Sequence, residues 1–164
     1  MHIIPIEKKH IDSYWQAFDQ IASERIFFGI TRAFPMEETR VFVRNCIRKG
    51  IPFLVAVERD QVIGWCDIQP AEKHTGTLGI GVLKAYRGGG VGKRLMREAL
   101  KAAGAYGYRS VQLNVRMSNL RAIHLYKQFG FISAGIRRNY LEIDGKVEDV
   151  LHMKLYLCAP DFED

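Results

Sequence analysis

The feature that most constrains this chain is a run of glycines between a predicted strand and a predicted amphipathic helix. Residues 75–83 read as a strand, residues 88–92 are Gly-Gly-Gly-Val-Gly, and apolar residues then recur at helical spacing. At the start of a helix the first N–H groups lack carbonyl partners, and glycines let an anion approach them closely. The segment therefore predicts a phosphate-binding turn, although a glycine turn without any ligand is the simpler alternative.

Two common phosphate motifs do not fit this turn. In a Walker A loop, Arg87 would stand at the first glycine and Arg94 at the Ser/Thr that binds Mg²⁺. In a Gly-x-Gly-x-x-Gly dinucleotide fingerprint, Gly88 and Gly90 fit, but Lys93 occupies the third glycine. The sequence therefore excludes these two nucleotide-binding classes and keeps a positively charged turn for another phosphate ligand.

The rest of the pattern predicts an α/β (α+β) chain with a mixed, mostly antiparallel central sheet flanked by helices. The predicted strands are residues 3–6, 52–58, 62–68, 75–83, 110–115, 131–142 and 147–156. The predicted helices are residues 10–25, a segment from about 35 to 50, a segment from 91 to 104–107, and one that begins after Asn119, a typical cap residue. Asp144-Gly145 indicates a type I′ hairpin turn.

Composition indicates an ordinary globular protein. The chain has 164 residues, of which 48% are hydrophobic and 26% charged, so we expect a single domain over residues 1–157 and a loose tail at residues 158–164. We recognise no signal peptide and no apolar run of membrane-spanning length, and the three cysteines are far apart. These features predict a cytoplasmic protein with reduced thiols and no membrane partner.

Charge and histidine spacing narrow the ligands. The net charge of +6 suits an anionic ligand, but no recognition-helix motif or interleaving of aromatic and basic residues points to nucleic acid. The five histidines show no paired ligand spacing, so no metal site is predicted.

Two motifs at a matching separation resemble a known family. Arg87, Gly90 and Gly92 form Arg-x-x-Gly-x-Gly, which resembles the acetyl-CoA pyrophosphate loop of the GCN5-related N-acetyltransferase (GNAT) superfamily. Residues 113–135 (LNVRMSNLRAIHLYKQFGFISAG) resemble its second motif, and the hairpin of residues 52–68 resembles its central strands. The end of the chain resembles a branch that acetylates α-amino groups of amino acids, peptide termini or small amines.

The resemblance implies a GNAT-like fold and an enzyme that transfers acetyl from acetyl-CoA to a primary amine, by direct attack in a ternary complex. The acceptor would be a small-molecule or peptide amine, and a homodimer is permitted. Backbone groups of residues 81–83 would pair with the pantetheine amides, and an N–H near Val82 would bind the developing oxyanion. The implied cofactor-binding residues are Gly81, Val82, Leu83, Arg87, Gly88, Gly89, Gly90, Val91, Gly92, Lys93 and Asn119.

Tyr126 is the candidate general acid, since it matches the tyrosine of the family's Leu-Tyr-x-x-Gly-Phe pattern. A phenol with a pKa near ~10 can protonate a departing thiolate without being ionised beforehand. The alternative is a core aromatic, because Tyr126 lies three residues from both Ile123 and Phe129. Asn119 also has two interpretations: it caps its own helix, or it binds the cofactor or a catalytic water, and both can hold.

The general base is not assigned by the sequence. Asp67, Glu72 and His74 are near the predicted cofactor strand, but each also fits a solvated or loop residue, and a water relayed to backbone carbonyls is equally compatible. Asn114, at a strand end, is a further candidate to line the site. A non-catalytic acyl-CoA sensor on the same fold is the alternative function, and the presence of Tyr126 argues against it.

Overall fold

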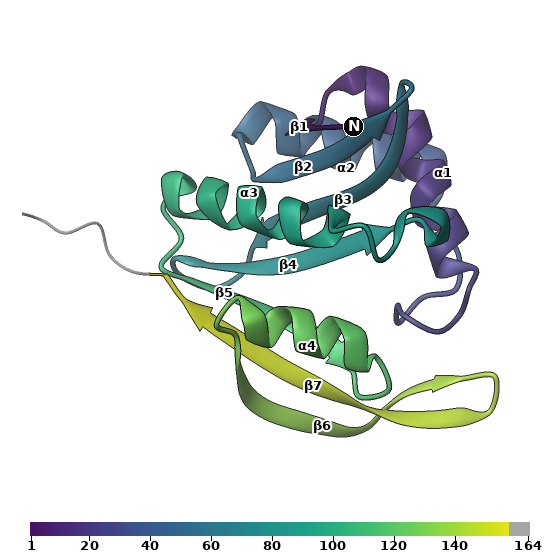
Figure 1. Cartoon of the computed structure of the whole chain (residues 1–164), viewed down its shortest axis with the longest axis vertical. Helices are drawn as coiled ribbons and strands as arrows, with labels where there is room; N and C mark the ends of the chain where they lie inside the picture. The colour runs from purple at the N-terminus through teal and green to yellow at the C-terminus, as the bar shows by residue number, and fades with distance from the viewer. Residues whose placement is uncertain (158–164) are drawn as a thin grey trace, which may run out of the picture.

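A computed structural model describes residues 1–157 and shows one seven-stranded mixed sheet with helices on both faces (Figure 1). The tail expected at residues 158–164 lies outside the described residues. The strands are β1 (His2–Pro5), β2 (Phe53–Glu58), β3 (Gln61–Pro70), β4 (Thr75–Val82), β5 (Ser110–Arg116), β6 (Ile132–Ile143) and β7 (Lys146–Tyr156). The α-helices are α1 (Ile11–Ala22), α2 (Met36–Lys49), α3 (Val91–Tyr106) and α4 (Leu120–Gln128), and two short 3₁₀ turns cover Lys8–His10 and Lys84–Tyr86.

The predicted fold class is confirmed, because the sheet order is β1-β2-β3-β4-β5-β7-β6 and only the β4–β5 pair is parallel. Local signals account for several boundaries. The Asn119 side chain accepts a hydrogen bond from the Ala122 N–H and so caps α4. Asp144 and Gly145 both have positive φ, as a type I′ turn between β6 and β7 requires.

The sheet separates two hydrophobic cores. One core packs α3 and α4 against the sheet and contains Leu95, Leu113, Tyr126 and Met153. The other packs α1 and α2 against the opposite face and contains Trp65. Successive side chains along a strand point to opposite faces of the sheet. Within each regular stretch of strand, alternate residues therefore lie on the α3/α4 side and on the α1/α2 side.

The parallel strands β4 and β5 stay together for only three residue pairs. Thr75, Gly76 and Thr77 pair with Ser110, Val111 and Gln112, after which the two strands separate. Beyond that point β4 remains paired with β3 and β5 remains paired with β7. We call this region, where β4 residues 78–82 have no partner on the β5 side, the β4–β5 divergence.

Candidate active site

The β4–β5 divergence exposes main-chain groups of β4. The N–H of Leu83 donates to the Ile63 carbonyl at 2.9 Å, so Leu83 and alternate residues before it face β3. The N–H and C=O groups of Ile80 and Val82 therefore point away from β3, toward the divergence. Of the main-chain groups expected at residues 81–83, the N–H of Val82 is available to an extended ligand, whereas the N–H of Leu83 is already paired and the Val82 carbonyl accepts from Arg87. Ile80, which sequence reasoning did not name, offers its main-chain groups in the same way.

A second set of free donors lies at the start of α3. The first hydrogen bond of this helix runs from the Arg94 N–H to the Gly90 carbonyl at 3.1 Å, so the N–H groups of residues 91–93 have no helical partner. Gly88 and Gly90 have φ of 86° and 83°, which L side chains rarely adopt. No atom lies within 4 Å of a Cβ placed on Gly90. The turn therefore offers main-chain donors and the positive end of a helix dipole to a phosphate group.

The Arg87 side chain serves this turn by holding it in place. Its guanidinium forms a two-pronged ion pair with Glu24, with N···O distances of 2.9 and 2.6 Å, and its Nε donates to the Val82 carbonyl at 2.8 Å. The same guanidinium lies 4.6 Å above the Phe27 ring. The Arg87 hydrogen bond lowers the pKa of the Glu24 carboxyl, which keeps the pair charged. Arg87 thus ties the turn to the segment that follows α1, and the donors that the turn leaves free are main-chain N–H groups.

Tyr126 lies on the α3/α4 side, where it is part of the core, and its role as the general acid stays a prediction. It is 7% exposed and packs against Phe131, with 5.9 Å between ring centroids. Its hydroxyl makes no hydrogen bond with the residues described, and no fully enclosed polar side-chain atom among them lacks a partner, so the hydroxyl reaches the surface. Burial raises the pKa of Tyr126, so the phenol stays protonated at neutral pH.

Asn119 uses only part of its amide to cap α4. Its Oδ1 accepts from the Ala122 N–H at 3.2 Å, while its amide nitrogen has no partner within residues 1–157. The cap interpretation is therefore confirmed, and the amide donor remains available for a ligand or a water.

Asn114 and His152 form a pair on the other face of the sheet. The two are cross-strand partners on β5 and β7, and Asn114 Oδ1 lies 3.0 Å from His152 Nδ1. Leu113 and Val115 on β5 face the α3/α4 core, so Asn114 between them lies on the α1/α2 side. Burial, together with Arg137 and Lys154, lowers the pKa of His152, so its imidazole is neutral at pH 7. An imidazole held by an amide and open on its other nitrogen can accept a proton.

Two of the three base candidates named from sequence lie in a loop, and the third is buried on β3. Glu72 and His74 are exposed in the β3–β4 loop, in agreement with their interpretation as loop residues. Asp67 does not fit a solvated residue: it is 9% exposed on β3, and its carboxylate accepts from Gln69 at 2.8 Å. The difference arises because β3 lies beneath α1 and α2, which the local sequence around Asp67 does not reveal.

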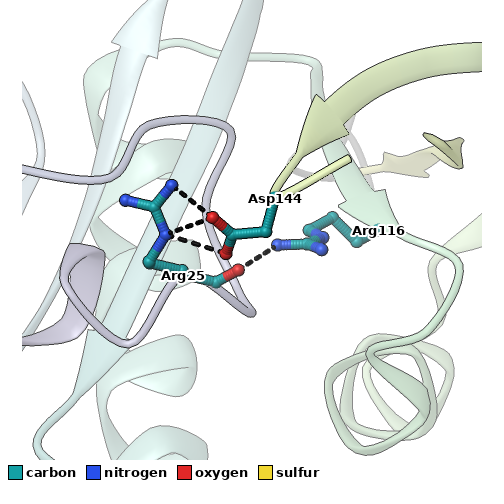
Figure 2. Close-up of polar contacts among 3 residues, drawn as sticks. All are labelled: Arg25, Arg116 and Asp144. Carbon is teal, nitrogen blue, oxygen red and sulfur yellow. Dashed lines mark hydrogen bonds and ion pairs between the residues drawn. The ribbon is translucent and has the colours of Figure 1, made fainter. Parts of the chain in front are cut away.

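A polar clamp joins the α1–α2 loop to the β6–β7 turn (Figure 2). Arg25 binds the Asp144 carboxylate at 2.7–3.0 Å, and Arg116 donates to the Arg25 carbonyl at 3.0 Å. Arg116 is itself paired with Glu148 at 2.7 Å. Beside this clamp, loop residues 29–35 and turn residues 142–144 line a surface depression of about 590 Å³. The depression is open enough to admit the end of a peptide or a small amine.

Residues 1–157 contain no group of three or more His, Cys, Asp or Glu side chains placed to hold a metal ion. None of the helices formed by these residues is long and apolar enough to cross a membrane.

Comparisons with known proteins give a consistent result. The family model described as acetyltransferase (GNAT) family matches residues 13–131. A [ribosomal protein bS18]-alanine N-acetyltransferase of Haemophilus influenzae is 32% identical over 105 residues, which are 63% of this chain and 71% of that protein. An L-amino acid N-acetyltransferase of Escherichia coli is 31% identical over 111 residues, covering 65% and 68% of the two chains.

A solved structure has the same fold. The crystal structure of a GNAT superfamily phosphinothricin acetyltransferase from Sinorhizobium meliloti, in complex with AcCoA, superimposes with a TM-score of 0.88. It is 19% identical in sequence, and the match covers 95% of this chain and 88% of that one.

Proposed function

Because the chain belongs to the acetyltransferase (GNAT) family, and is thus an acetyl-CoA-dependent N-acetyltransferase, we propose that it acetylates a primary α-amine of a peptide terminus or amino acid by direct transfer. One observation carries the proposal: the β4–β5 divergence has free main-chain donors along β4, a phosphate-binding turn beyond its end, and proton-transfer groups on its two faces. The named relatives act on ribosomal-protein alanine and on L-amino acids, and both are α-amines.

Acetyl-CoA, when bound, supplies an activated thioester carbonyl and a thiolate leaving group. The N–H groups of residues 91–93 would hold its diphosphate, with help from the adjacent Lys93 charge. The main chain of Ile80 and Val82 would pair with its amides as an added strand does, and one of these N–H groups would donate to the thioester oxygen. The residues present fit the group, because these donors are unpaired and Gly90 leaves open space beside them.

Tyr126 would protonate the departing sulfur. A phenol whose pKa is raised by burial is fully protonated at neutral pH, so it always carries the proton that the thiolate needs.

His152 would act as the general base from the α1/α2 side, oriented by Asn114. In a register continued past the last paired residues, Asn114 lies level with Gly79, one residue before Ile80. A neutral imidazole can remove a proton from the acceptor ammonium, directly or through a water molecule, and so give the free amine that attacks the carbonyl. The acceptor would enter past the depression beside the Arg25–Asp144 clamp. Tyr126 and His152 would then act from opposite faces of the sheet.

Steady-state kinetics with acetyl-CoA and an Ala-initiated peptide or free L-amino acids test the proposal. Tyr126→Phe should lower kcat about 10²-fold or more while leaving the Kd of acetyl-CoA within about twofold, since general-acid catalysis contributes ~10²–10⁴-fold. Tyr106→Phe, at an exposed tyrosine at the end of α3, is the matched control. Unchanged turnover in Tyr126→Phe would exclude Tyr126 as the general acid. If none of the α-amines supports release of the CoA thiol, the proposed activity is overturned.

The pH profile tests the base separately. In the wild-type protein, kcat/KM should fall at low pH with a midpoint below the ordinary histidine pKa of 6.5, because protonated His152 cannot accept a proton. His152→Gln should lose this limb and retain only the titration of the acceptor amine. A variant that keeps the low-pH limb and full activity would exclude His152 as the base.

A further inference from the structure

A second cavity lies under α1 and α2. It shares Ala33 and Phe34 with the depression beside the clamp, and the proposed reaction uses none of its other lining residues. It has a volume of about 360 Å³, which is within the range of small-molecule sites. Its walls are mainly aromatic, and one buried carboxylate lines it. The side chains that define it here are Tyr14, Trp15, Phe18, Phe34, Phe42 and Asp67.

The aromatic walls are held in place by hydrogen bonds and ring contacts. Trp15 Nε1 donates to the Phe34 carbonyl at 2.7 Å, and Asp19 accepts from the Ala33 N–H at 2.8 Å, which fixes the loop that carries Phe34. Tyr14 contacts Trp65 edge-on, with 5.3 Å between ring centroids. A cavity with walls fixed in this way is preformed and loses little conformational entropy when a ligand binds.

Asp67 brings a negative charge into this cavity without a counter-charge. It is 9% exposed, accepts one side-chain hydrogen bond from Gln69, and has no ion pair within residues 1–157. Two carboxylate oxygens can accept about four hydrogen bonds, so acceptor capacity remains. Burial raises the pKa of Asp67 to about 6, which leaves the group largely ionised at pH 7.5.

The other titratable groups around the cavity add no positive charge. Glu38 lines it and is acidic, and no Lys, Arg or His lines it. Burial raises the pKa of Tyr14 and of Cys46, so both stay neutral; the Cys46 sulfur lies 3.5 Å from the Gln69 amide nitrogen. The arrangement therefore combines an uncompensated carboxylate with the faces and edges of several aromatic rings.

We propose that this cavity binds an organic cation, with an alkylammonium group against Asp67 and an apolar body between the aromatic walls. An ammonium group removes the cost of a lone buried carboxylate, and aromatic faces attract cations while excluding water. A neutral ligand of the same shape gains the apolar contacts but not the charge interaction. The cavity should therefore discriminate by charge as well as by shape.

The cation site is separate from the reacting thioester. Asp67 pairs with Gly79, which lies three residues before Val82 on β4, and strand geometry makes that about 10 Å. Trp65 pairs with Gly81 and covers it, so its ring lies between the two positions. A ligand at Asp67 therefore does not place its own nitrogen at the thioester.

Isothermal titration with benzyltrimethylammonium at pH 7.5, without acetyl-CoA, tests the proposal. This probe has a permanent charge and no N–H bond, so it cannot be acetylated, and benzyl alcohol is its neutral comparison. Asp67→Asn should weaken binding about tenfold or more, whereas Glu38→Gln, which removes a charge from the same cavity, should change it less than about threefold. Equal binding by Asp67→Asn, or binding of benzyl alcohol as tight as the cation, overturns the proposal.

A second variant guards against a folding defect in Asp67→Asn. Phe34→Ala alters a side chain that is 55% exposed, so the fold should persist while cation binding weakens about threefold or more. Unchanged binding in this variant would remove the aromatic wall from the site. Because the probe is not a substrate, the result stands whether or not α-amines prove to be the acceptors. Competition of the probe with the acceptor would identify the cation as a remote group of the acceptor, and its absence would identify a separate ligand.

Discussion

Gly81 packs against Trp65 on the strand proposed to bind the cofactor, and replacing it with alanine tests both its packing and that proposal. A Cβ on Gly81 would lie 2.5–2.8 Å from three carbons of the Trp65 indole, where ~3.5–4.0 Å is the favourable spacing. Either β4 or the indole must shift by about 1 Å. Overpacking of this kind costs ~1–3 kcal/mol, and the lower chain entropy of alanine offsets ~0.4–1 kcal/mol. We expect a net loss of about 1–2 kcal/mol in the free energy of unfolding.

Urea denaturation and thermal unfolding measure this loss, which corresponds to a Tm lower by about 3–8 °C for a chain of this size. Gly104→Ala is the opposite control: nothing lies within 4 Å of its Cβ, and alanine in a helix should raise stability by about 0.5–1 kcal/mol. Gly76→Ala should destabilise the fold as well, because its Cβ would meet Ile68 and lie 2.9 Å from Tyr108.

Kinetics then separate a general loss of stability from a local one. Gly81 lies between Ile80 and Val82, so its substitution should also raise the KM for acetyl-CoA several-fold, about 1 kcal/mol of lost contact. Gly76 lies where β4 is still paired with β5, and its substitution should leave KM unchanged below the unfolding temperature. A Gly81→Ala protein with wild-type stability and KM would refute the reasoning about this strand.

Three further changes have definite expected outcomes. Burial raises the pKa of Asp67 from 3.8 to about 6, so its carboxylate destabilises the fold above pH 6. Asp67→Asn should therefore raise the unfolding free energy by up to ~3 kcal/mol at pH 8, and this gain should disappear near pH 4. Urea titrations that give an equal gain at both pH values would contradict this prediction. Asn119→Ala should cost ~1 kcal/mol of stability, because the α4 cap is lost. Asn119→Ser should restore the stability but not the KM for acetyl-CoA if the amide nitrogen binds the cofactor. Full kinetic recovery in the Ser variant would assign Asn119 to capping alone. Glu24→Gln weakens the ion pair with Arg87, so it should raise the KM for acetyl-CoA several-fold and lower stability by about 1 kcal/mol. Fluorescence titration and urea denaturation can measure these changes. An unchanged KM would show that the turn does not depend on this ion pair.

Features set by neighbouring residues were predictable from the sequence. The Asp144-Gly145 turn and the Asn119 cap depend on local hydrogen bonds and φ angles, and both form as expected. The glycine turn at residues 88–92 is also a local signal, since it needs only left-handed glycines before a helix.

Features that depend on distant pairing were not predictable in the same way. Arg87 adds positive charge near the turn in the sequence, but its partner Glu24 is 63 residues away and directs the guanidinium elsewhere. The Asn114–His152 contact depends on the register between β5 and β7, which no local pattern specifies. Asp67 reads as a polar residue at the end of a short strand, and its burial follows only when α1 and α2 cover β3.

The brief pairing of β4 with β5 would make the hydrogen bonding of the sheet depend on the bound cofactor. Residues 78–82 of β4 make no strand hydrogen bonds on the side that faces β5, and a bound pantetheine arm would supply some of them. Ligand binding and completion of the sheet are then one event, so occupancy should slow amide deuterium exchange at Ile80 and Val82 and couple the two halves of the molecule mechanically.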